Sequence, residues 1–313
     1  MKQIHVAAGA IEDAAGRILI TKRPDHVHQG GLWEFPGGKL DPGEGVQVAL
    51  ARELDEELGI RIIAAHPLIR VHHDYGDRHV LLDVHRVTAF AGAPQGREGQ
   101  PLAWVHPDDM DPRTFPAADR PIITALRLPR LYLITGDDPR TPATFLARLD
   151  RALAAGVRLV QLRAHALGGE AYRALARAAF DRCEANGARL LLNADPDLVA
   201  DLPGHGLHLT SARLWRLPAR PPGRAWVGAS CHTAADLDRA AVLGLEYALL
   251  SPVKATTTHP DAKPLGWDTF SDLADPAALP VYALGGLVPA DLAEAIARGA
   301  QGIAAIRGLW PSG

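Results

Sequence analysis

Cysteine is almost absent from this chain, since Cys183 and Cys231 are the only two among its 313 residues. Two cysteines are too few for the disulfide framework on which many small secreted domains depend. No apolar run approaches the roughly 20 residues that a bilayer-spanning helix needs. The early apolar stretch is interrupted by Glu12 and Asp13, so it does not read as a secretory signal. We therefore expect a cytoplasmic protein with no membrane partner.

An excess of positive charge is also missing. The 33 Lys and Arg residues and 36 Asp and Glu residues give a formal net charge of −3. Such a chain lacks a broad basic surface, so we expect no direct nucleic-acid partner. Hydrophobic residues, at 47%, suffice for a full core, and the length suits two domains of about 150 residues each. The sequence does not indicate an oligomeric state.

The spacing of the apolar runs divides the chain into two parts. In the first part, such runs predict three strands, at residues 5–11, 17–23 and 79–90. The last of these alternates like an exposed edge strand. Leucines at every fourth position predict one helix, at residues 46–58. We therefore predict a first domain, residues 1–128, that contains a mixed sheet and a central helix.

A regular pattern follows in residues 129–313. Eight short apolar runs recur there, mostly separated by alanine-rich stretches that predict helices, at residues 131–135, 159–163, 189–193, 206–210, 226–230, 247–252, 281–286 and 302–308. The intervals 193–206 and 210–226 contain Pro and Gly and indicate loops. Eight strands that alternate with crossovers predict a parallel (β/α)8 barrel rather than an open doubly wound sheet.

The strongest chemical signal is a concentration of acids in the predicted helix and the loop before it. Six of the 36 acidic residues fall within residues 41–57. Glu53, Glu56 and Glu57 stand at i, i+3 and i+4, so their carboxylates share one helical face. Like charges this close repel each other unless a cation lies among them, and Mg²⁺ prefers oxygen ligands. The pattern therefore predicts a Mg²⁺ site, with Mn²⁺ as the alternative ion.

This segment resembles the signature of the Nudix hydrolases. That signature reads Gly-x5-Glu-x7-Arg-Glu-U-x-Glu-Glu-x-Gly-U, with U aliphatic, and residues 38–60 match it at every fixed position. The resemblance implies an α/β/α sandwich that hydrolyses a nucleoside diphosphate linked to another moiety. It assigns metal binding to Glu53, Glu56 and Glu57, with Glu98 as a further ligand or base. The glycine loop before the helix lets the backbone approach closely, so we expect the Gly37 carbonyl to add a metal oxygen. The resemblance assigns catalysis to Arg52, which orients a carboxylate, and to Glu53 and Glu98, of which either is the base.

Residues 4–126 further resemble the bacterial MutT-type hydrolases, which remove pyrophosphate from oxidised guanine nucleotides such as 8-oxo-dGTP. The matching segments include "ITKR" (20–23), "WEFPGGK" (33–39) and "FPAADRPII" (115–123). The resemblance implies that Arg23 and His28 meet phosphate and sugar. Glu34, Phe35 and Arg78 would then shape the nucleoside pocket. Substrate contacts are also implied for Pro36, Gly37, Lys39 and Asp119.

Asp119 departs from the family pattern, which has asparagine at this position. An amide can accept a hydrogen bond from N7–H of oxidised guanine and donate another to O6, whereas an ionised carboxylate only accepts. Asp119 would face O6 unfavourably unless it is protonated, or it would accept from N1–H and N2–H₂ in another pose. The preference between oxidised and normal guanine therefore stays open.

Residues 131–310 resemble the thiamine-phosphate synthase and thiazole tautomerase family, through segments such as "GVRLVQLRAH", "VGASCHT" and "LLSPVKATTTHPDAKPLGW". These segments fall at the predicted C-terminal ends of strands, where barrel enzymes carry their chemistry. The resemblance implies a proton-transfer role for His232 and a thiazole or thiamine phosphate as ligand. It implies phosphate or ligand contacts for Gln161, Arg163, Asn193, Thr256, Thr258, Gly285 and Gly286.

Several catalytic positions depart from a synthase. The family's Asn-Asp pair after strand three is Asn193-Ala194 here, and a second metal-binding Asp corresponds to Arg213. Two lysines that hold pyrophosphate are replaced by His165 and His259, and Asp195 stands one residue beyond the lost acid. Without these acids the barrel loses its Mg²⁺ clamp. Three roles stay open for it: synthase, tautomerase, or a non-catalytic sensor of a phosphate ligand.

The two resemblances together predict a Mg²⁺-dependent nucleoside triphosphate diphosphohydrolase fused to a thiamine-phosphate-synthase-like barrel. We expect the hydrolase to convert 8-oxo-dGTP into the monophosphate and pyrophosphate. Because of the fusion, hydrolysis of thiamine-pathway diphosphates is the alternative.

Overall fold

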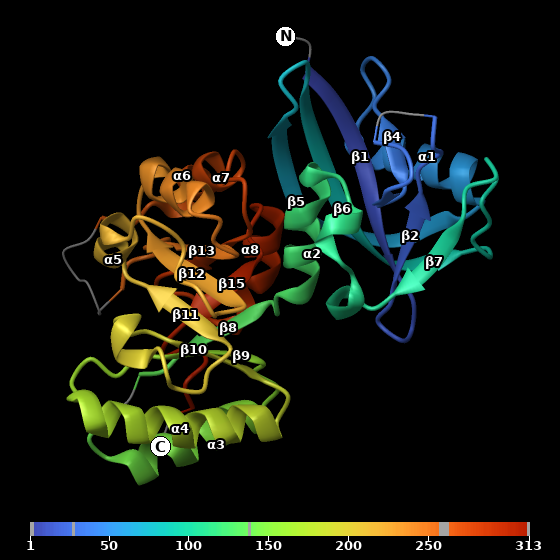
Figure 1. The fold of residues 1–313 in the computed structure, drawn as a ribbon. Coiled ribbons are helices and arrows are strands. Elements are labelled where there is room, and N and C mark those ends of the chain that lie inside the picture. The colour runs from blue at the N-terminus through green and yellow to red at the C-terminus, as the bar shows by residue number, and fades with distance from the viewer. Residues whose placement is uncertain (1–2, 27–28, 137–138, 257–262, 312–313) are drawn as a thin grey trace. The chain divides into compact units, whose positions relative to one another are not determined.

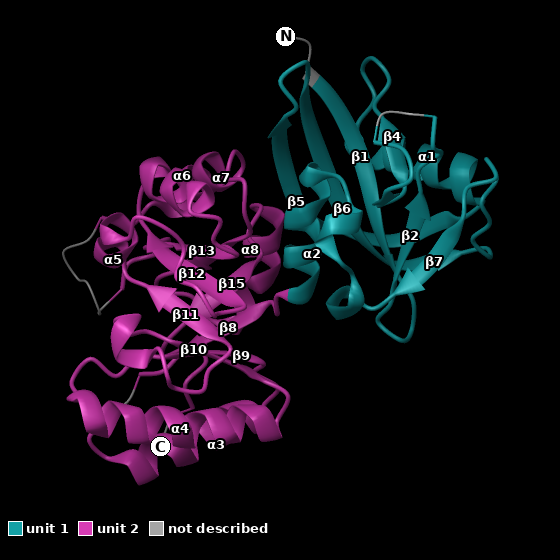
Figure 2. Ribbon diagram, in the orientation of Figure 1, with its two compact units in different colours: residues 1–127 teal, residues 128–313 magenta. Residues whose placement is uncertain are grey.

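The computed structural model describes residues 3–26, 29–136, 139–256 and 263–311. The chain separates into two compact units, which Figure 2 distinguishes by colour: unit 1 is Met1–Arg127 and unit 2 is Leu128–Gly313. Each unit has its own buried hydrophobic core. None of the helices among the described residues combines the length and apolarity needed to cross a membrane.

Unit 1 is built on a seven-stranded mixed sheet. Its main strand order is β3-β2-β1-β6-β5, while β4 pairs with β1 and β7 pairs with β2. The strands β1 and β6 run parallel, and the other paired strands run antiparallel. The bounds are β1 Gln3–Glu12, β2 Ile18–Lys22, β3 Trp33–Glu34, β4 Gly37–Lys39, β5 Arg61–Asp74, β6 His79–Ala91 and β7 Leu102–Val105.

Two helices cover the two faces of this sheet, α1 (Val46–Leu58) and α2 (Arg120–Arg127), as Figure 1 shows. Because neighbouring residues of a strand point to opposite faces, Ala7 packs in the core beside α1 and Ala8 packs in the core beside α2. The leucines spaced by four make the buried stripe of α1. Short 3₁₀ helices, η1 (Pro107–Asp109), η2 (Pro112–Thr114) and η3 (Ala117–Asp119), lead into α2. The predicted α/β/α sandwich is confirmed.

Two features of unit 1 differ from the sequence prediction. The helix predicted at residues 46–58 is α1, but the prediction that residues 79–90 form an exposed edge strand is wrong. Strand β6 lies between β1 and β5, and its residues 82–85 are buried. The edge strand on this side of the sheet is β5, which the apolar pattern missed because exposed and partly buried residues are mixed along β5 and its register shifts at several points.

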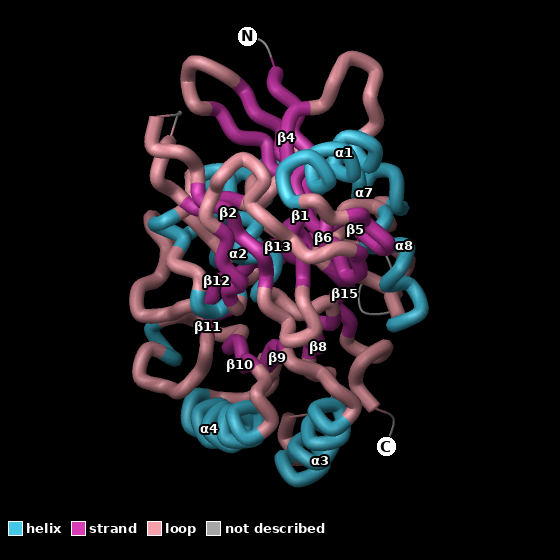
Figure 3. Tube along the Cα trace, turned by 90° about the vertical axis from the view of Figure 1, so that its right-hand side faces the viewer, coloured by secondary structure: helices cyan, strands magenta, loops and turns pink. Residues whose placement is uncertain are grey.

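Unit 2 is a closed barrel of eight parallel strands, so the predicted barrel is confirmed. Each of the eight predicted runs coincides with one strand, with β12 ending one residue later than predicted. The strands are β8 Leu131–Ile134, β9 Leu159–Leu162, β10 Arg189–Leu192, β11 Gly206–Leu209, β12 Trp226–Cys231, β13 Tyr247–Leu250, β14 Val281–Leu284 and β15 Gly302–Ala305. The helices α3 (Pro142–Ala154) and α4 (Gly169–Ala185) lie side by side against the barrel (Figures 1 and 3).

The remaining helical segments of unit 2 are shorter. They are η4 Asp197–Val199, α5 Ser211–Arg216, α6 Ala234–Val242, α7 Gly266–Ala274, η5 Pro289–Asp291 and α8 Leu292–Ala297. The two Pro- and Gly-containing intervals that predicted loops hold only η4 and the six-residue α5.

Aromatic side chains fill the barrel interior. Tyr132, Tyr247 and Tyr282 are fully buried there and contact one another through their rings. Gly228 makes room for them, because a Cβ at this position would lie 2.0 Å from Cζ of Tyr247. The barrel is therefore a packed core, in which the tyrosine hydroxyls, Gln161 and His208 are joined by buried hydrogen bonds.

Candidate functional site

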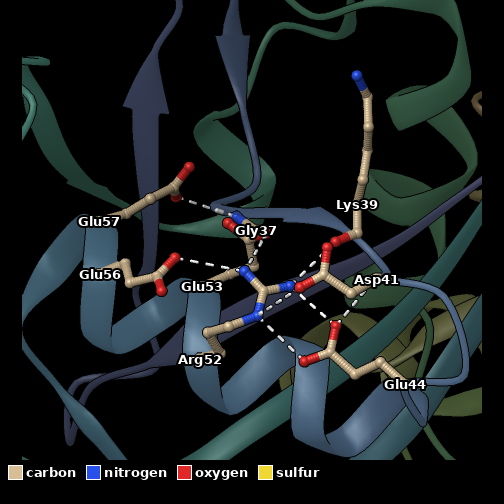
Figure 4. A network of polar contacts seen from close by, with 8 residues as sticks. All are labelled: Gly37, Lys39, Asp41, Glu44, Arg52, Glu53, Glu56 and Glu57. Atoms are coloured by element: carbon tan, nitrogen blue, oxygen red, sulfur yellow. Dashed lines mark hydrogen bonds and ion pairs between the residues drawn. The ribbon is translucent and has the colours of Figure 1, made fainter.

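Arg52 organises the carboxylates of unit 1 (Figure 4). Its Nε and Nη2 donate hydrogen bonds to the two carboxylate oxygens of Glu44, at 3.0 and 2.9 Å. Its Nη1 donates to Glu53 at 2.8 Å and to Glu56 at 3.3 Å, and its Nη2 also reaches the carbonyl oxygen of Lys39 at 3.1 Å. These bonds, above all those to Glu44, raise the pKa of Arg52. One guanidinium thus joins the loop before α1 to the acidic face of the helix.

Glu57 lies on the same helix but faces the backbone of β4. Its Oε2 accepts a hydrogen bond from the N–H of Gly37 at 3.2 Å. Burial is the main cause that raises the pKa of Glu57 to about 8. The neighbouring carboxylates of Glu34, Glu98 and Glu53 add to that rise. Negative charge is therefore concentrated around Glu57 beyond what nearby cations balance.

Two glycines of β4 allow this crowding. A Cβ on Gly37 would lie 2.1 Å from the carbonyl oxygen of Ala7, and the residue has φ +144°. A Cβ on Gly38 would lie 2.2 Å from the carboxyl carbon of Glu53 and 2.3 Å from both its oxygens. Only glycine lets β4 pass between β1 and the Glu53 carboxylate, so a side chain at either position would clash with its neighbours.

A divalent cation fits the chemistry of this donor set. Carboxylates gathered around Glu57 closely enough to raise its pKa, together with backbone carbonyls, are the hard oxygen ligands that such ions prefer. Within the described part of the chain, no three acidic, His or Cys side chains are gathered tightly enough to hold an ion in this arrangement. Glu53 and Glu56 instead contact Arg52. Glu98, in the loop after β6, is exposed, but its charge reaches Glu57 and Glu34.

A second group of predicted residues meets beside the acidic helix. Arg23 of the loop after β2 forms an ion pair with Glu34 of β3. Asp119, at the end of η3, is only 7% exposed, and burial raises its pKa to about 8. The charge of Glu34 acts in the same direction, and Arg23 opposes it. The structure thus brings Arg23, Glu34 and Asp119 together in one polar group, in which Asp119 is buried and the other two are partly buried.

Aromatic rings border this polar group. Phe35 is 5% exposed and stacks on Phe115 at 5.8 Å between ring centroids. Tyr75, in the turn between β5 and β6, hydrogen-bonds the backbone of Ala118. Burial raises the pKa of Tyr75, and the charge of Asp119 raises it further. Sequence reasoning missed Phe115 and Tyr75, because nothing in their local pattern marks them as neighbours of Asp119.

Four other residues of unit 1 are predicted to bind substrate, namely Arg78, Lys39, Pro36 and His28. Arg78 pairs with the adjacent Asp77 at 2.5 Å. The Lys39 side chain is exposed, and Pro36 is buried. His28 lies outside the described residues.

In unit 2, three predicted ligand-binding residues sit at the C-terminal ends of neighbouring strands. Asn193 donates from Nδ2 to Oε1 of Gln161 at 2.8 Å and accepts at Oδ1 from Nη1 of Arg213 at 3.1 Å. Gln161 and Asn193 are 2% and 5% exposed. The backbone N–H of Arg163 donates to Thr135 at 2.9 Å, which fixes the segment that carries the Arg163 side chain.

His232 follows β12 and has an exposed side chain. Its Nδ1 lies 2.9 Å from the carbonyl oxygen of Ser251, which can only accept, so Nδ1 carries the hydrogen in this contact. The Nε2 atom is left with a lone pair, which suits a proton acceptor. The carboxylate of Asp236 accepts from the backbone N–H groups of His232 and Thr233 and holds the loop.

The paired glycines after β14 have a steric role. Gly285 and Gly286 have φ of +110° and +66°. A Cβ would lie 2.8 Å from Cα of Pro252 at the first position and 2.5 Å from the carbonyl oxygen of Ala255 at the second. They therefore let the segment after β13 pack on them, up to Thr256, while Thr258 and His259 lie outside the described residues.

Asp195 does not replace the lost acid of the barrel in this arrangement. Its side chain is exposed, and its Oδ1 accepts from the backbone N–H of Asp197 at 3.1 Å. Asn193 contacts Arg213 instead.

Comparison with known proteins agrees with both halves of this description. Residues 7–125 match the Nudix domain family, and residues 131–309 match the thiamine monophosphate synthase family. The chain is 35% identical over 127 residues to the 8-oxo-dGTP diphosphatase of Escherichia coli strain K12, which covers 41% of this chain and 98% of that protein. It is 38% identical over 125 residues to the CTP pyrophosphohydrolase of the same organism, covering 40% of this chain and 92% of that protein.

Unit 2 has relatives of its own. The chain is 32% identical over 190 residues to the thiamine-phosphate synthase of Thioalkalivibrio sulfidiphilus, which covers 60% of this chain and 90% of that protein. The acidic helix with its glycine strand and the eight-stranded barrel thus both have close counterparts among known enzymes. The chain belongs to the Nudix hydrolases through its first unit and to the thiamine monophosphate synthase family through its second.

Proposed function

We propose that unit 1 is a Mg²⁺-dependent diphosphohydrolase that converts 8-oxo-dGTP into 8-oxo-dGMP and pyrophosphate. The observation that carries this proposal is the convergence of Glu53 and Glu57 on the Gly37–Gly38 backbone beside the polar group of Arg23, Glu34 and Asp119. The similarity to an 8-oxo-dGTP diphosphatase over 98% of that protein's length supports the choice of substrate.

The acidic helix would hold the metal. Oxygen ligands for it are available from Glu53, Glu56, Glu57, Glu98 and the Gly37 carbonyl. When bound, Mg²⁺ neutralises the diphosphate charge and lowers the pKa of a water molecule. Arg52 holds Glu53 and Glu56 in place, and the β4 glycines let the diphosphate approach the backbone closely. Glu53 or Glu98 accepts the proton of the attacking water.

Asp119 would be protonated, and it would recognise the base through this neutral carboxylic acid group. Burial keeps its proton on at pH 7, so the group offers one O–H donor and one carbonyl acceptor. It can then donate to O6 and accept from N7–H of oxidised guanine, as an asparagine amide would. Normal guanine has a bare N7 that would face the acceptor oxygen, so dGTP is the poorer substrate.

The experiment is a substrate panel with purified full-length protein. Pyrophosphate or phosphate release from 8-oxo-dGTP, dGTP, CTP, hydroxymethylpyrimidine diphosphate and thiamine diphosphate is measured with Mg²⁺, with Mn²⁺ and with EDTA. We expect the highest kcat/KM for 8-oxo-dGTP and loss of activity in EDTA. A higher kcat/KM for CTP or for either thiamine-pathway compound would move the assignment to that substrate.

The thiamine-pathway compounds are included for a specific reason. The barrel of the same chain belongs to the thiamine monophosphate synthase family, and fused units often serve linked reactions. CTP is included because a relative of similar identity is a CTP pyrophosphohydrolase. Activity retained in full by both the Glu53→Gln and the Glu57→Gln variant would refute the proposed roles whatever the substrate.

A further inference from the structure

The loop between β6 and β7, residues 92–101, is bound to the C-terminal end of the acidic helix α1. The backbone N–H of Gln95 donates to the carbonyl oxygen of Leu58 at 3.0 Å. The backbone N–H of Arg97 donates to the carbonyl oxygen of Glu57, also at 3.0 Å. The last carbonyl groups of a helix have no partner within the helix, so donors from outside stabilise them. The β6–β7 loop therefore caps the helix that carries the carboxylates.

The side chain of Arg97 strengthens this attachment. Its Nη1 donates to the carbonyl oxygen of Asp55 at 2.6 Å and lies 3.6 Å from Oδ1 of the same residue. A Cβ on Gly59 would lie 2.5 Å from Nη2 of Arg97, so the guanidinium lies directly over this glycine. A cation is favourable at this end of a helix, because the helix dipole is negative there. Gly59, the last glycine of the signature, thus leaves room for the cation that closes the helix.

Gln100 joins the loop to the helix through both ends of its side-chain amide. Its Nε2 donates to the carbonyl oxygen of Glu57 at 3.2 Å, and its Oε1 accepts from the backbone N–H of Glu98 at 2.9 Å. A carbonyl oxygen only accepts and an N–H only donates, so the two partners fix which end of the amide faces each of them. One side chain thus connects the backbone of Glu98 to that of Glu57, the residue at the centre of the acidic cluster.

The turn that carries Glu98 is tight. The N–H of Gly99 donates to the carbonyl oxygen of Gly96 at 3.0 Å. A Cβ on Gly96 would lie 2.2 Å from the carbonyl oxygen of Gln100, so the two ends of the turn are in close contact. Gln100 is partly buried, whereas Glu98 is exposed. The exposed carboxylate therefore stands on a compact turn whose partly buried end is fixed to α1.

The charge of Glu98 reaches the acidic cluster. Burial is the main cause that raises the pKa of both Glu57 and Glu34, and the charge of Glu98 raises each of them further. Interactions between charges weaken with distance, so the position of the loop sets the size of this contribution. Whether Glu98 is a base or a metal ligand, its carboxylate has to lie at the cluster.

We propose that Gln100 is a positioning residue of the hydrolase, whose amide holds the Glu98 carboxylate at the acidic helix by joining the Glu98 N–H to the Glu57 carbonyl oxygen. Arg97 secures the same loop to the end of the helix. This inference rests on the proposed hydrolase function and deepens it, because it gives the β6–β7 loop a defined part in the reaction.

Steady-state kinetics of the full-length protein with 8-oxo-dGTP and Mg²⁺ test the proposal. Gln100→Met keeps the length of the side chain and removes both hydrogen bonds. We expect it to lower kcat about tenfold or more and to change KM less than about threefold, because Glu98 acts in the reaction step. Gln47→Met changes an exposed glutamine of α1 and should stay within about twofold of the wild type in both constants. Equal kcat of the wild type and the Gln100→Met variant overturns the proposal.

A second substitution tests whether both hydrogen bonds are needed. Gln100→Glu keeps an acceptor for the Glu98 N–H but turns a carboxylate oxygen toward the carbonyl oxygen of Glu57, which also only accepts. This variant should therefore lose as much in kcat as Gln100→Met, with the far-ultraviolet circular dichroism unchanged. Full activity of the Gln100→Glu variant contradicts a bridge to Glu57.

The dependence on Glu98 separates positioning from a general effect on packing. In a Glu98→Gln background the carboxylate to be positioned is gone, so Gln100→Met should lower kcat less than about twofold further. The same loss in both backgrounds would show that Gln100 acts without Glu98, and it overturns the proposal.

Amide hydrogen exchange in metal-free, full-length protein measures the bridge without any reaction. The amide of Glu98 should exchange at least about tenfold faster in the Gln100→Met variant than in the wild type, while amides within α1 keep their rates. Unchanged exchange at Glu98 rules out the bridge.

Failure of the proposed substrate and failure of the proposed role of Gln100 give different results. If another compound of the substrate panel has the higher kcat/KM, the same variants are compared with that compound. A large loss in the Gln100→Met variant then supports the positioning role although the substrate proposal has failed. A wild type that hydrolyses 8-oxo-dGTP no faster than its Gln100→Met variant overturns the role of Gln100 alone.

Discussion

Replacing Asp119 by asparagine should remove a pH dependence from the stability of unit 1. Asp119 is 7% exposed, and burial raises its pKa from 3.8 to about 8. On unfolding the carboxyl returns to water and its ordinary pKa. Between these two values the folded state holds a proton that the unfolded state has released. The free energy of unfolding of the wild type therefore falls as the pH rises through this window.

The size of the effect follows from the shift. Each pH unit inside the window costs about 1.4 kcal/mol for one proton. Asp119 alone should thus lower the free energy of unfolding by about 2.7 kcal/mol between pH 5 and pH 7. Above pH 8 the carboxyl ionises in both states, and the slope from this group disappears. An asparagine amide has nearly the same shape and does not titrate.

Urea denaturation of the wild type and the Asp119→Asn variant at pH 5, 6, 7 and 8 measures this. We expect the stability of the variant relative to the wild type to grow with pH across this range. The matched control is Asp109→Asn, because Asp109 is exposed and its solvation changes little on unfolding. A difference between the wild type and the Asp119→Asn variant that does not vary with pH would refute the neutral Asp119.

Three further predictions test the packing and the catalytic geometry. Gly38→Ala places a Cβ 2.2 Å from the Glu53 carboxyl carbon, so we expect pyrophosphate release to slow about tenfold or more in a folded protein. Arg52→Lys loses the fork that joins Glu53 to the preceding loop, so steady-state kinetics should show a lower kcat with circular dichroism unchanged. Gly228→Ala forces a methyl group into the Tyr247 ring, and urea denaturation should show unit 2 destabilised by about 1–3 kcal/mol or more.

Local patterns made the helix and the barrel strands predictable. The leucines of α1 repeat within one helix, and each barrel strand is a short buried run, so neither depends on distant residues. The interpretation of residues 79–90 as an edge strand failed for the opposite reason. Whether a strand lies at the edge depends on its partner strands, and the partner β5 has an irregular burial pattern and shifting register, so it does not show the simple alternation that predicts a strand.

The polar interior of the barrel could not be predicted from the sequence. Tyr132 and Tyr247 are 115 positions apart, and no motif links either of them to Gln161 or His208. The motif residues Gln161 and Asn193 were expected to touch a ligand, and the structure places them within a continuous hydrogen-bonded chain. Likewise, Tyr75 reaches Asp119 only because the β5–β6 turn folds beside η3.

The products formed from 8-oxo-dGTP test the central claim most directly. Chromatography of a reaction with Mg²⁺ should show 8-oxo-dGMP and pyrophosphate in equal amounts, formed faster than the products of dGTP. The Glu57→Gln variant should lose at least about 100-fold in rate, because Glu57 stands at the centre of the acidic cluster. Release of inorganic phosphate with 8-oxo-dGDP, or an unchanged rate in the Glu57→Gln variant, would contradict the account.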